Sequence, residues 1–191
     1  MSNSGKVPTA RVYGEALLAA GAAHGFSPPD AAEARAGRVM AGELMGHDVA
    51  EVETILALLA LQPGSTLVFR EDARVTGFAS TLLLKSGAKA ELLADRFDGL
   101  SPQGALLCGP DDPVGLYYVW GVAGSTKAAT TAIMRLQAAL RYATLANLTA
   151  YALAVTPAGR RAGLTQLDYL PARGPDDALI VGAPTAQRSA A

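Results

Sequence analysis

The sequence is poor in cysteine and in charge, and it contains no long apolar run. Cys108 is the single cysteine of the 191 residues, which excludes an internal disulfide and fits a reducing compartment. The longest apolar run, residues 54–61, is far shorter than the roughly 20 residues that cross a bilayer. Residues 1–6 are polar and lack the basic-then-apolar order of a secretory signal. We therefore expect a cytoplasmic protein with no membrane partner.

Basic residues are scarce overall but unevenly placed. The net charge of −1 and the lack of an interleaved aromatic and basic array argue against a nucleic-acid partner. Residues 1–119 hold 9 Lys or Arg against 14 Asp or Glu, whereas residues 120–173 hold 6 against one. This asymmetry suggests that the basic segment meets an anion, unless its charges pair internally.

Apolar residues make up half of the chain, enough for the core of one globular domain that spans residues 1–191. Their spacing is helical over residues 9–62 and β-type over most of residues 65–183. Helices first, then a hairpin, then a strand–helix–strand unit indicate an α+β fold. We expect a mixed, mostly antiparallel twisted sheet flanked by helices, with an extended helical N-terminal part.

Turn residues and changes of period divide the chain into elements. Three helices are expected before Pro63, ending near Gly25, Met45 and Leu61, the second of them behind a Ser27 cap. The later elements, in order, are a hairpin (66–69 with 74–84), a short helix (88–97), a strand (116–122), a loop (123–129), a helix to about 146, a strand (149–155) and a short strand (179–181). The strands on either side of the long helix should be neighbours, either parallel or splayed apart.

The segment between the 116–122 strand and the following helix has the chemistry of a phosphate site. Residues 128–132 are all small, and the first N–H groups of a helix have no partner within the helix. Lys127 adds a full positive charge, so a pyrophosphate could approach closely. The spaced glycines of a Walker loop and the acid of a Rossmann fingerprint are both missing.

This segment resembles the GNAT superfamily of acyltransferases. In that family a strand ending in Val-x-Pro precedes Arg/Gln-x-x-Gly-x-Gly/Ala, which opens a long helix. Here Val122-x-Gly124 precedes Lys127-Ala-Ala-Thr130-Thr-Ala132 at the same spacing. Residues 168–171 (Asp-Tyr-Leu-Pro) are similar to the family's Gly-Phe-x-Pro, and Gly77-Phe78 to its earlier Gly-Phe.

The resemblance implies that the chain binds acetyl-CoA or another acyl-CoA and transfers the acyl group to an amine of a small molecule or protein. The residues implied to hold the cofactor are those of the motif: Val122, Gly124, Lys127, Ala128, Ala129, Thr130, Thr131 and Ala132. On this basis Arg160 and Arg161 could meet a 3′-phosphate.

The chain departs from the family pattern in ways that keep other hypotheses open. Lys127 replaces Arg or Gln, Thr130 replaces the first Gly, and Leu164 stands where the family often places a Tyr general acid. The second hypothesis is therefore the same fold without chemistry, a binding or regulatory module that could be a homodimer. The third is a structural α+β protein unrelated to the family.

Few residues outside this unit have the chemistry of a catalyst. Glu43 and His47 lie at i, i+4 on one helix face and could act as a general base. Two such ligands are too few for a metal, so no metal site is expected. Tyr118, another tyrosine of its strand or Tyr169 could replace the missing acid. Cys108 lies in an apolar stretch without a His partner, which predicts a buried, inert thiol.

Overall fold

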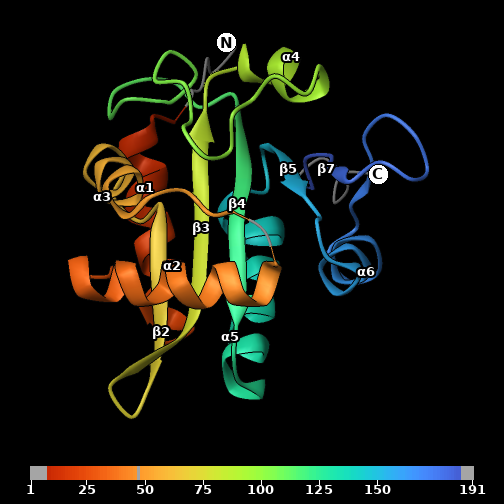
Figure 1. Ribbon diagram of the computed structural model, residues 1–191. Coiled ribbons are helices and arrows are strands. Elements are labelled where there is room, and N and C mark those ends of the chain that lie inside the picture. Colours follow the sequence, from red (N-terminus) through yellow and green to blue (C-terminus); the bar gives the residue numbers. More distant parts are fainter. Residues whose placement is uncertain (1–7, 47, 186–191) are drawn as a thin grey trace.

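A computed structural model describes residues 8–46 and 48–185 of the chain, and its strands form a single seven-stranded sheet (Figure 1). The strand order is β1-β2-β3-β4-β5-β7-β6, and only the β4–β5 pair is parallel. The expected α+β fold with a mixed, mostly antiparallel sheet is therefore confirmed.

The elements follow one another in an order that begins with helices and ends with strands. The helices are α1 (Ala10–Ala23), α2 (Ala31–Met45), α3 (Val52–Leu61), α4 (Ala88–Leu93), α5 (Lys127–Ala139), the π-helical turn η1 (Leu140–Thr144) and α6 (Pro157–Gln166). The strands are β1 (Phe26–Ser27), β2 (Thr66–Glu71), β3 (Arg74–Leu84), β4 (Leu116–Gly124), β5 (Thr149–Leu153), β6 (Leu170–Pro171) and β7 (Leu179–Gly182).

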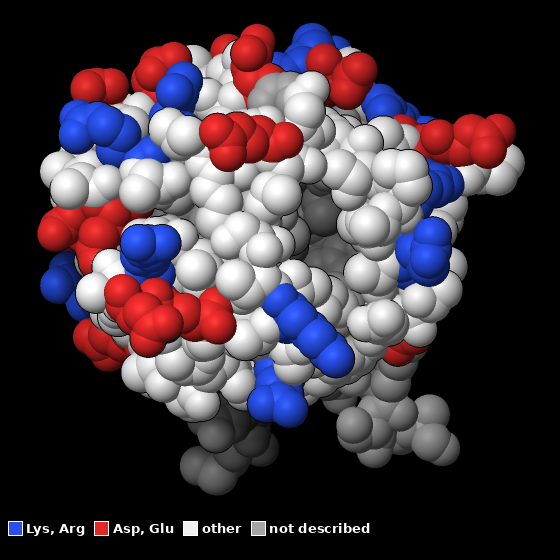
Figure 2. Space-filling model, turned by 60° about the horizontal axis from the view of Figure 1, so that its bottom comes forward, with Lys and Arg blue, Asp and Glu red and all other residues white. Residues whose placement is uncertain are grey.

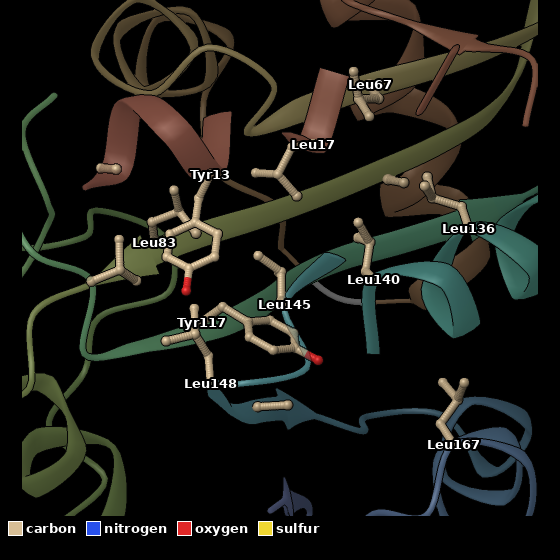
Figure 3. Close-up of a cluster of buried hydrophobic side chains, with 14 of the residues drawn as sticks. Tyr13, Leu17, Leu67, Leu83, Tyr117, Leu136, Leu140, Leu145, Leu148 and Leu167 are labelled. Atoms are coloured by element: carbon tan, nitrogen blue, oxygen red, sulfur yellow. The ribbon is translucent and has the colours of Figure 1, made fainter. Parts of the chain in front are cut away.

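Helices cover both faces of the sheet. In Figure 1, α2 crosses in front of β2, β3 and β4, while α5 lies behind β4. The core behind the sheet joins α1 to α5, with Leu17 and Leu136 both buried in it (Figure 3). The core in front joins α2 and α3 to the sheet through Ile55 and Phe78.

Alternation along the central strands places neighbouring residues in different cores. Leu83 and Tyr117 pair across β3 and β4 and face the α1–α5 side (Figure 3). Leu82 and Tyr118, the next pair, face the opposite side with α4. Because side chains of a strand alternate between faces, a continuously apolar strand such as β4 is buried on both.

Gln62, just after α3, connects three parts of the chain through one buried side chain. Its Nε2 donates to the carbonyl oxygens of Leu83 at 2.7 Å and Cys108 at 2.9 Å, and its Oε1 accepts from the N–H of Leu83 at 2.9 Å. The amide is therefore satisfied inside the core, as buried polar groups usually are.

Several helix boundaries differ from those expected. α2 begins behind Asp30, which forms a reciprocal capping box with Glu33, so the prediction of a Ser27 cap is wrong. α4 stops at Leu93. α5 begins at Lys127, so residues 127–129, expected in a loop, form the first turn of the helix.

The sequence reading missed α6, β1 and β6. Two of these are strands of two residues, too short for a periodic signal. α6 did carry a start signal, because the Thr156 side chain caps it and Pro157 occupies its first position. Within the described residues, no helix has both the length and the apolarity that spanning a bilayer requires.

Candidate active-site cleft

The site is created by the divergence of β4 and β5. These two strands pair in parallel only from Leu116 with Thr149 to Val119 with Ala152. β4 continues to Gly124, while the chain after β5 turns away into α6. The β5-facing edge of residues 120–124 therefore has no strand beside it. Both arrangements considered from the sequence occur, parallel pairing at one end and separation at the other.

A cleft of about 750 Å³ fills the space between the diverging strands. Its walls come from β4, α5, the end of β5, α6 and the segment between α2 and α3, and most are apolar or small. Asp48 is the only described lining residue with a formal charge at neutral pH. Figure 2 shows a hollow with uncharged walls on the face that was the lower end of the molecule in Figure 1, with Lys and Arg side chains beside it.

The start of α5 is held rigidly beside this cleft. Thr126 caps the helix, since its Oγ1 accepts from the N–H of Ala129 at 3.0 Å and donates to Glu71 Oε2 at 2.5 Å. The hydrogen bond from Thr126 and a second one from Thr76 lower the pKa of the Glu71 carboxyl. Gly124 is packed so closely that a Cβ there would lie 2.9 Å from the backbone nitrogen of Thr130. The strand end and the helix start therefore form one tight junction.

The predicted cofactor residues fall on two sides of that junction. Val122, Gly124 and Thr130 line the cleft. Lys127, Ala128, Thr131 and Ala132 line a second hollow of about 670 Å³, between α5 and the end of α1. Ala129 is fully buried between them. The first turn of α5 thus separates the cleft from a more basic surface that also includes Arg135 and His24.

Of the two predicted catalytic residues that the structure describes, Tyr118 lines the cleft and Glu43 does not. Glu43 is exposed on α2 and is not among the cleft-lining residues, and His47 lies outside the described residues. Tyr118 lines the cleft and is 5 % exposed. Burial raises the pKa of Tyr118 to about 12, so its hydroxyl stays protonated at neutral pH.

Tyr169 also lines the cleft, supported from behind by a buried arginine. Arg141 is 1 % exposed and lies 5.5 Å from the centre of the Tyr169 ring. Its guanidinium donates to the carbonyl oxygens of Leu167 at 3.3 Å and Ala183 at 2.5 Å. Burial, and after it the neighbouring Tyr117, raises the pKa of Tyr169 well above its ordinary value, so this hydroxyl too is protonated at neutral pH.

The basic segment does not form one anion-binding surface. Arg141 is buried, Arg160 donates to the carbonyl oxygens of Pro175 and Asp177, and Arg173 pairs with Asp177 at 2.7 Å. Because its guanidinium already donates to these carbonyl oxygens, the structure does not support the suggestion that Arg160 meets a 3′-phosphate. Arg161 is exposed on α6. Part of the charge asymmetry seen in the sequence serves to hold the C-terminal region together.

Two cleft residues were not singled out from the sequence. Asp48 lies at the α2–α3 side of the cleft. Gln137 is 5 % exposed and lies on the cleft side of α5. Its spacing from Thr130 and Ile133 on one helix face was the available signal. Leu164, which stands where the family often places a Tyr general acid, packs against the core behind the sheet and is not among the cleft-lining residues.

Cys108 is fully buried, and burial raises the pKa of its thiol to about 11. In the described part of the chain, no three His, Cys, Asp or Glu side chains gather as metal ligands would.

Comparison of the chain with models of protein families, with curated proteins and with solved structures finds no match.

Proposed function

We propose that the chain binds an acyl-CoA in the cleft between β4 and α6, as a GNAT-like acyltransferase does. The observation that carries the proposal is the divergence of β4 and β5 beside the first turn of α5. A cofactor that lies along a strand needs an open strand edge, and residues 120–124 provide one. The same cleft offers apolar walls for the pantetheine arm and the acyl group.

The phosphate end of the cofactor belongs at the start of α5. The N–H groups of Lys127 and Ala128 lie in the first turn, where no helical acceptor exists for them, and the helix dipole is positive there. Lys127 adds a charge on the adjacent surface. The Glu71 carboxylate on Thr126 opposes this attraction, so we expect moderate rather than very tight binding.

Transfer to an amine would use the groups that line the same cleft. The amine nitrogen, after its ammonium form has lost a proton to solvent, attacks the thioester carbonyl carbon and forms the C–N bond. The nitrogen then gives a second proton to solvent, the C–S bond breaks, and the sulfur takes up a proton. Tyr118 and Tyr169 have protonated hydroxyls near neutral pH and are the candidate donors. Asp48, near Leu44 and Met45, would attract a cationic amine that carries an apolar group.

The second candidate is a module that binds acyl-CoA without chemistry. It is favoured by Leu164 at the position of the expected acid and by the depth of both tyrosines, which are 5 % and 3 % exposed. Release of free thiol from acetyl-CoA in the presence of a panel of amines distinguishes the candidates. Thiol release above the rate without protein supports transfer, and binding without release supports the module.

Isothermal titration with CoA and acetyl-CoA tests the binding itself. We expect saturable heat and a rise in melting temperature, because a ligand that binds the folded state stabilises it. No heat of binding and no change in melting temperature at millimolar CoA or acetyl-CoA would refute the proposal.

Charge reversal at the start of α5 tests the phosphate position. Lys127→Glu should weaken CoA binding strongly, and Lys89→Glu is the matched control. Lys89 is an exposed lysine of α4 that lines neither hollow, and α4 lies at the opposite end of the sheet from the start of α5 (Figure 1). Equal effects of the two changes would mean that the phosphates do not bind at the helix start.

A further inference from the structure

Gln137 is a buried side chain whose amide nitrogen has no hydrogen-bond partner in the described part of the chain. The side chain is 5 % exposed, and its Nε2 is buried with no hydrogen-bond acceptor in the described part of the chain. A buried amide without a partner costs free energy, because it has lost its water and gained nothing in return. Such a group in a cavity wall is where a ligand atom is expected.

The contrast with Gln62 shows that this chain can satisfy a buried glutamine. Gln62 is 2 % exposed and makes three hydrogen bonds to the backbone. It lies outside the cleft lining, whereas Gln137 belongs to it. The two residues share their chemistry and their burial, so the difference lies in what surrounds them.

The position of Gln137 along α5 indicates which part of a ligand it would meet. Thr130 and Gln137 both line the cleft and are seven residues apart, about 10 Å along the helix. As the crossover helix between parallel strands, α5 runs back along β4 from the open end at Gly124. A ligand anchored by phosphate at the helix start therefore passes Gln137 with its pantetheine arm.

We propose that Gln137 hydrogen-bonds a secondary amide of the pantetheine arm and so positions the acyl end in the cleft. This inference rests on the proposed binding of acyl-CoA. A primary amide has both donor and acceptor atoms, and a secondary amide of the ligand offers the complementary pair. Ile133 and Met134 on the same wall of α5 have no such pair of atoms to offer, and the Thr130 hydroxyl already donates to the carbonyl oxygen of Thr126 at 2.9 Å.

The test measures by isothermal titration how two ligands bind to the wild type and to two variants. CoA carries the pantetheine arm with its two amides, and adenosine 3′,5′-bisphosphate lacks the arm. Gln137→Met keeps the size of the side chain and removes its polar atoms. Gln166→Met makes the same change at an exposed position of α6 that does not line the cleft.

We expect Gln137→Met to weaken CoA binding about five- to tenfold, the effect of one lost hydrogen bond, and to leave bisphosphate binding unchanged. Gln166→Met should change neither. If the wild type binds CoA and Gln137→Met binds it equally well, this inference alone is overturned. No binding of CoA by the wild type would overturn the proposed function and this inference together.

Discussion

At the scale of single residues, hydrogen-bond partners distinguish the buried polar side chains that hold the fold together from the one that we propose contacts a ligand. Arg141 and Gln62 are buried and donate to backbone carbonyls of segments distant in sequence. Gln137 is equally buried without a bond of this kind in the described chain. Composition does not separate the two roles, because both glutamines stand among apolar neighbours in the sequence.

The two buried glutamines should respond oppositely to the same change. Gln62→Met leaves the N–H of Leu83 and the carbonyl oxygens of Leu83 and Cys108 without their partner, and should lower the free energy of unfolding by about 2–4 kcal/mol. Gln137→Met removes an unsatisfied group and should leave that free energy unchanged or raise it by up to about 1 kcal/mol. Urea unfolding of both variants measures this. A large loss of stability in Gln137→Met would show that the amide has a structural partner.

At the scale of elements, one ion pair ties the start of α2 to β2. Arg70 makes two hydrogen bonds of 2.6 Å to the Glu33 carboxylate, whose other contact is the N–H of Asp30 in the capping box. The bonds from Arg70 and then from Asp30 lower the pKa of Glu33 to about 2. The side chains of Glu33 and Arg70 are 27 % and 30 % exposed, so solvent screens the ion pair only partly.

This pair should make stability depend on pH in the acid range. The pKa of Glu33 is about 2 in the folded chain and has its ordinary value of 4.5 when unfolded, so its contribution is complete above pH 4.5. That contribution is lost as the pH falls toward 2. At pH 7, Glu33→Gln should be less stable than the wild type by about 1 kcal/mol, and the two should converge near pH 2.

Thermal unfolding across this pH range measures the difference between the two proteins. The control is the same Glu33→Gln change made in an Arg70→Met background, where the pH-dependent difference should largely vanish. A difference that persists without Arg70 would assign the effect to the capping box instead.

At the scale of the whole molecule, the cleft exists because a sheet divides at its centre. β1 to β4 continue as one antiparallel unit, and β5, β7 and β6 form another, joined only over four residue pairs of β4 and β5. α6 lies opposite α5 across the cleft and presents small residues to it, among them Ala158 and Ala162. Small side chains in this wall keep the cleft wide enough for a ligand.

A large side chain placed in the cleft from α6 should therefore weaken the proposed CoA binding without harming the fold. Ala162→Phe places a ring in the open space and should weaken CoA binding more than tenfold, while the melting temperature stays within a few degrees of the wild type. Thr165→Phe is the control, because Thr165 is exposed on the same helix outside the cleft lining. Calorimetry and a thermal melt measure both. Equal CoA affinity in wild type and Ala162→Phe would place the cofactor elsewhere.

Local patterns in the sequence were enough to predict much of the fold. The period of apolar residues and the turn residues predicted the β2–β3 hairpin, α1 to α3, β4 and the helix after it, because these signals act within a few residues. They failed where an element is too short to show a period, as in β1 and β6, or where glycine weakens it, as in α6.

The sequence allowed us to predict the site residues that are close together in the chain, but not those that come from distant segments. Val122, Gly124 and Thr130 were identified because a strand, a turn and a helix start follow one another directly. Asp48, Tyr169 and Gln137 join them through tertiary contacts from other elements or through the orientation of a helix face. A single sequence does not contain the distances between such segments.

The sequence by itself determined the class of fold, the junction between β4 and α5, and the burial of Cys108, since each follows from local period, local turn chemistry or a run of apolar neighbours. Only the tertiary structure decided that β4 and β5 separate after Val119 and that Lys127 faces the surface beside α1. It also decided that the amide nitrogen of Gln137, in the cleft wall, has no hydrogen-bond partner among the described residues. The physical reason is that strand separation and hydrogen-bond satisfaction depend on residues brought together from distant parts of the chain.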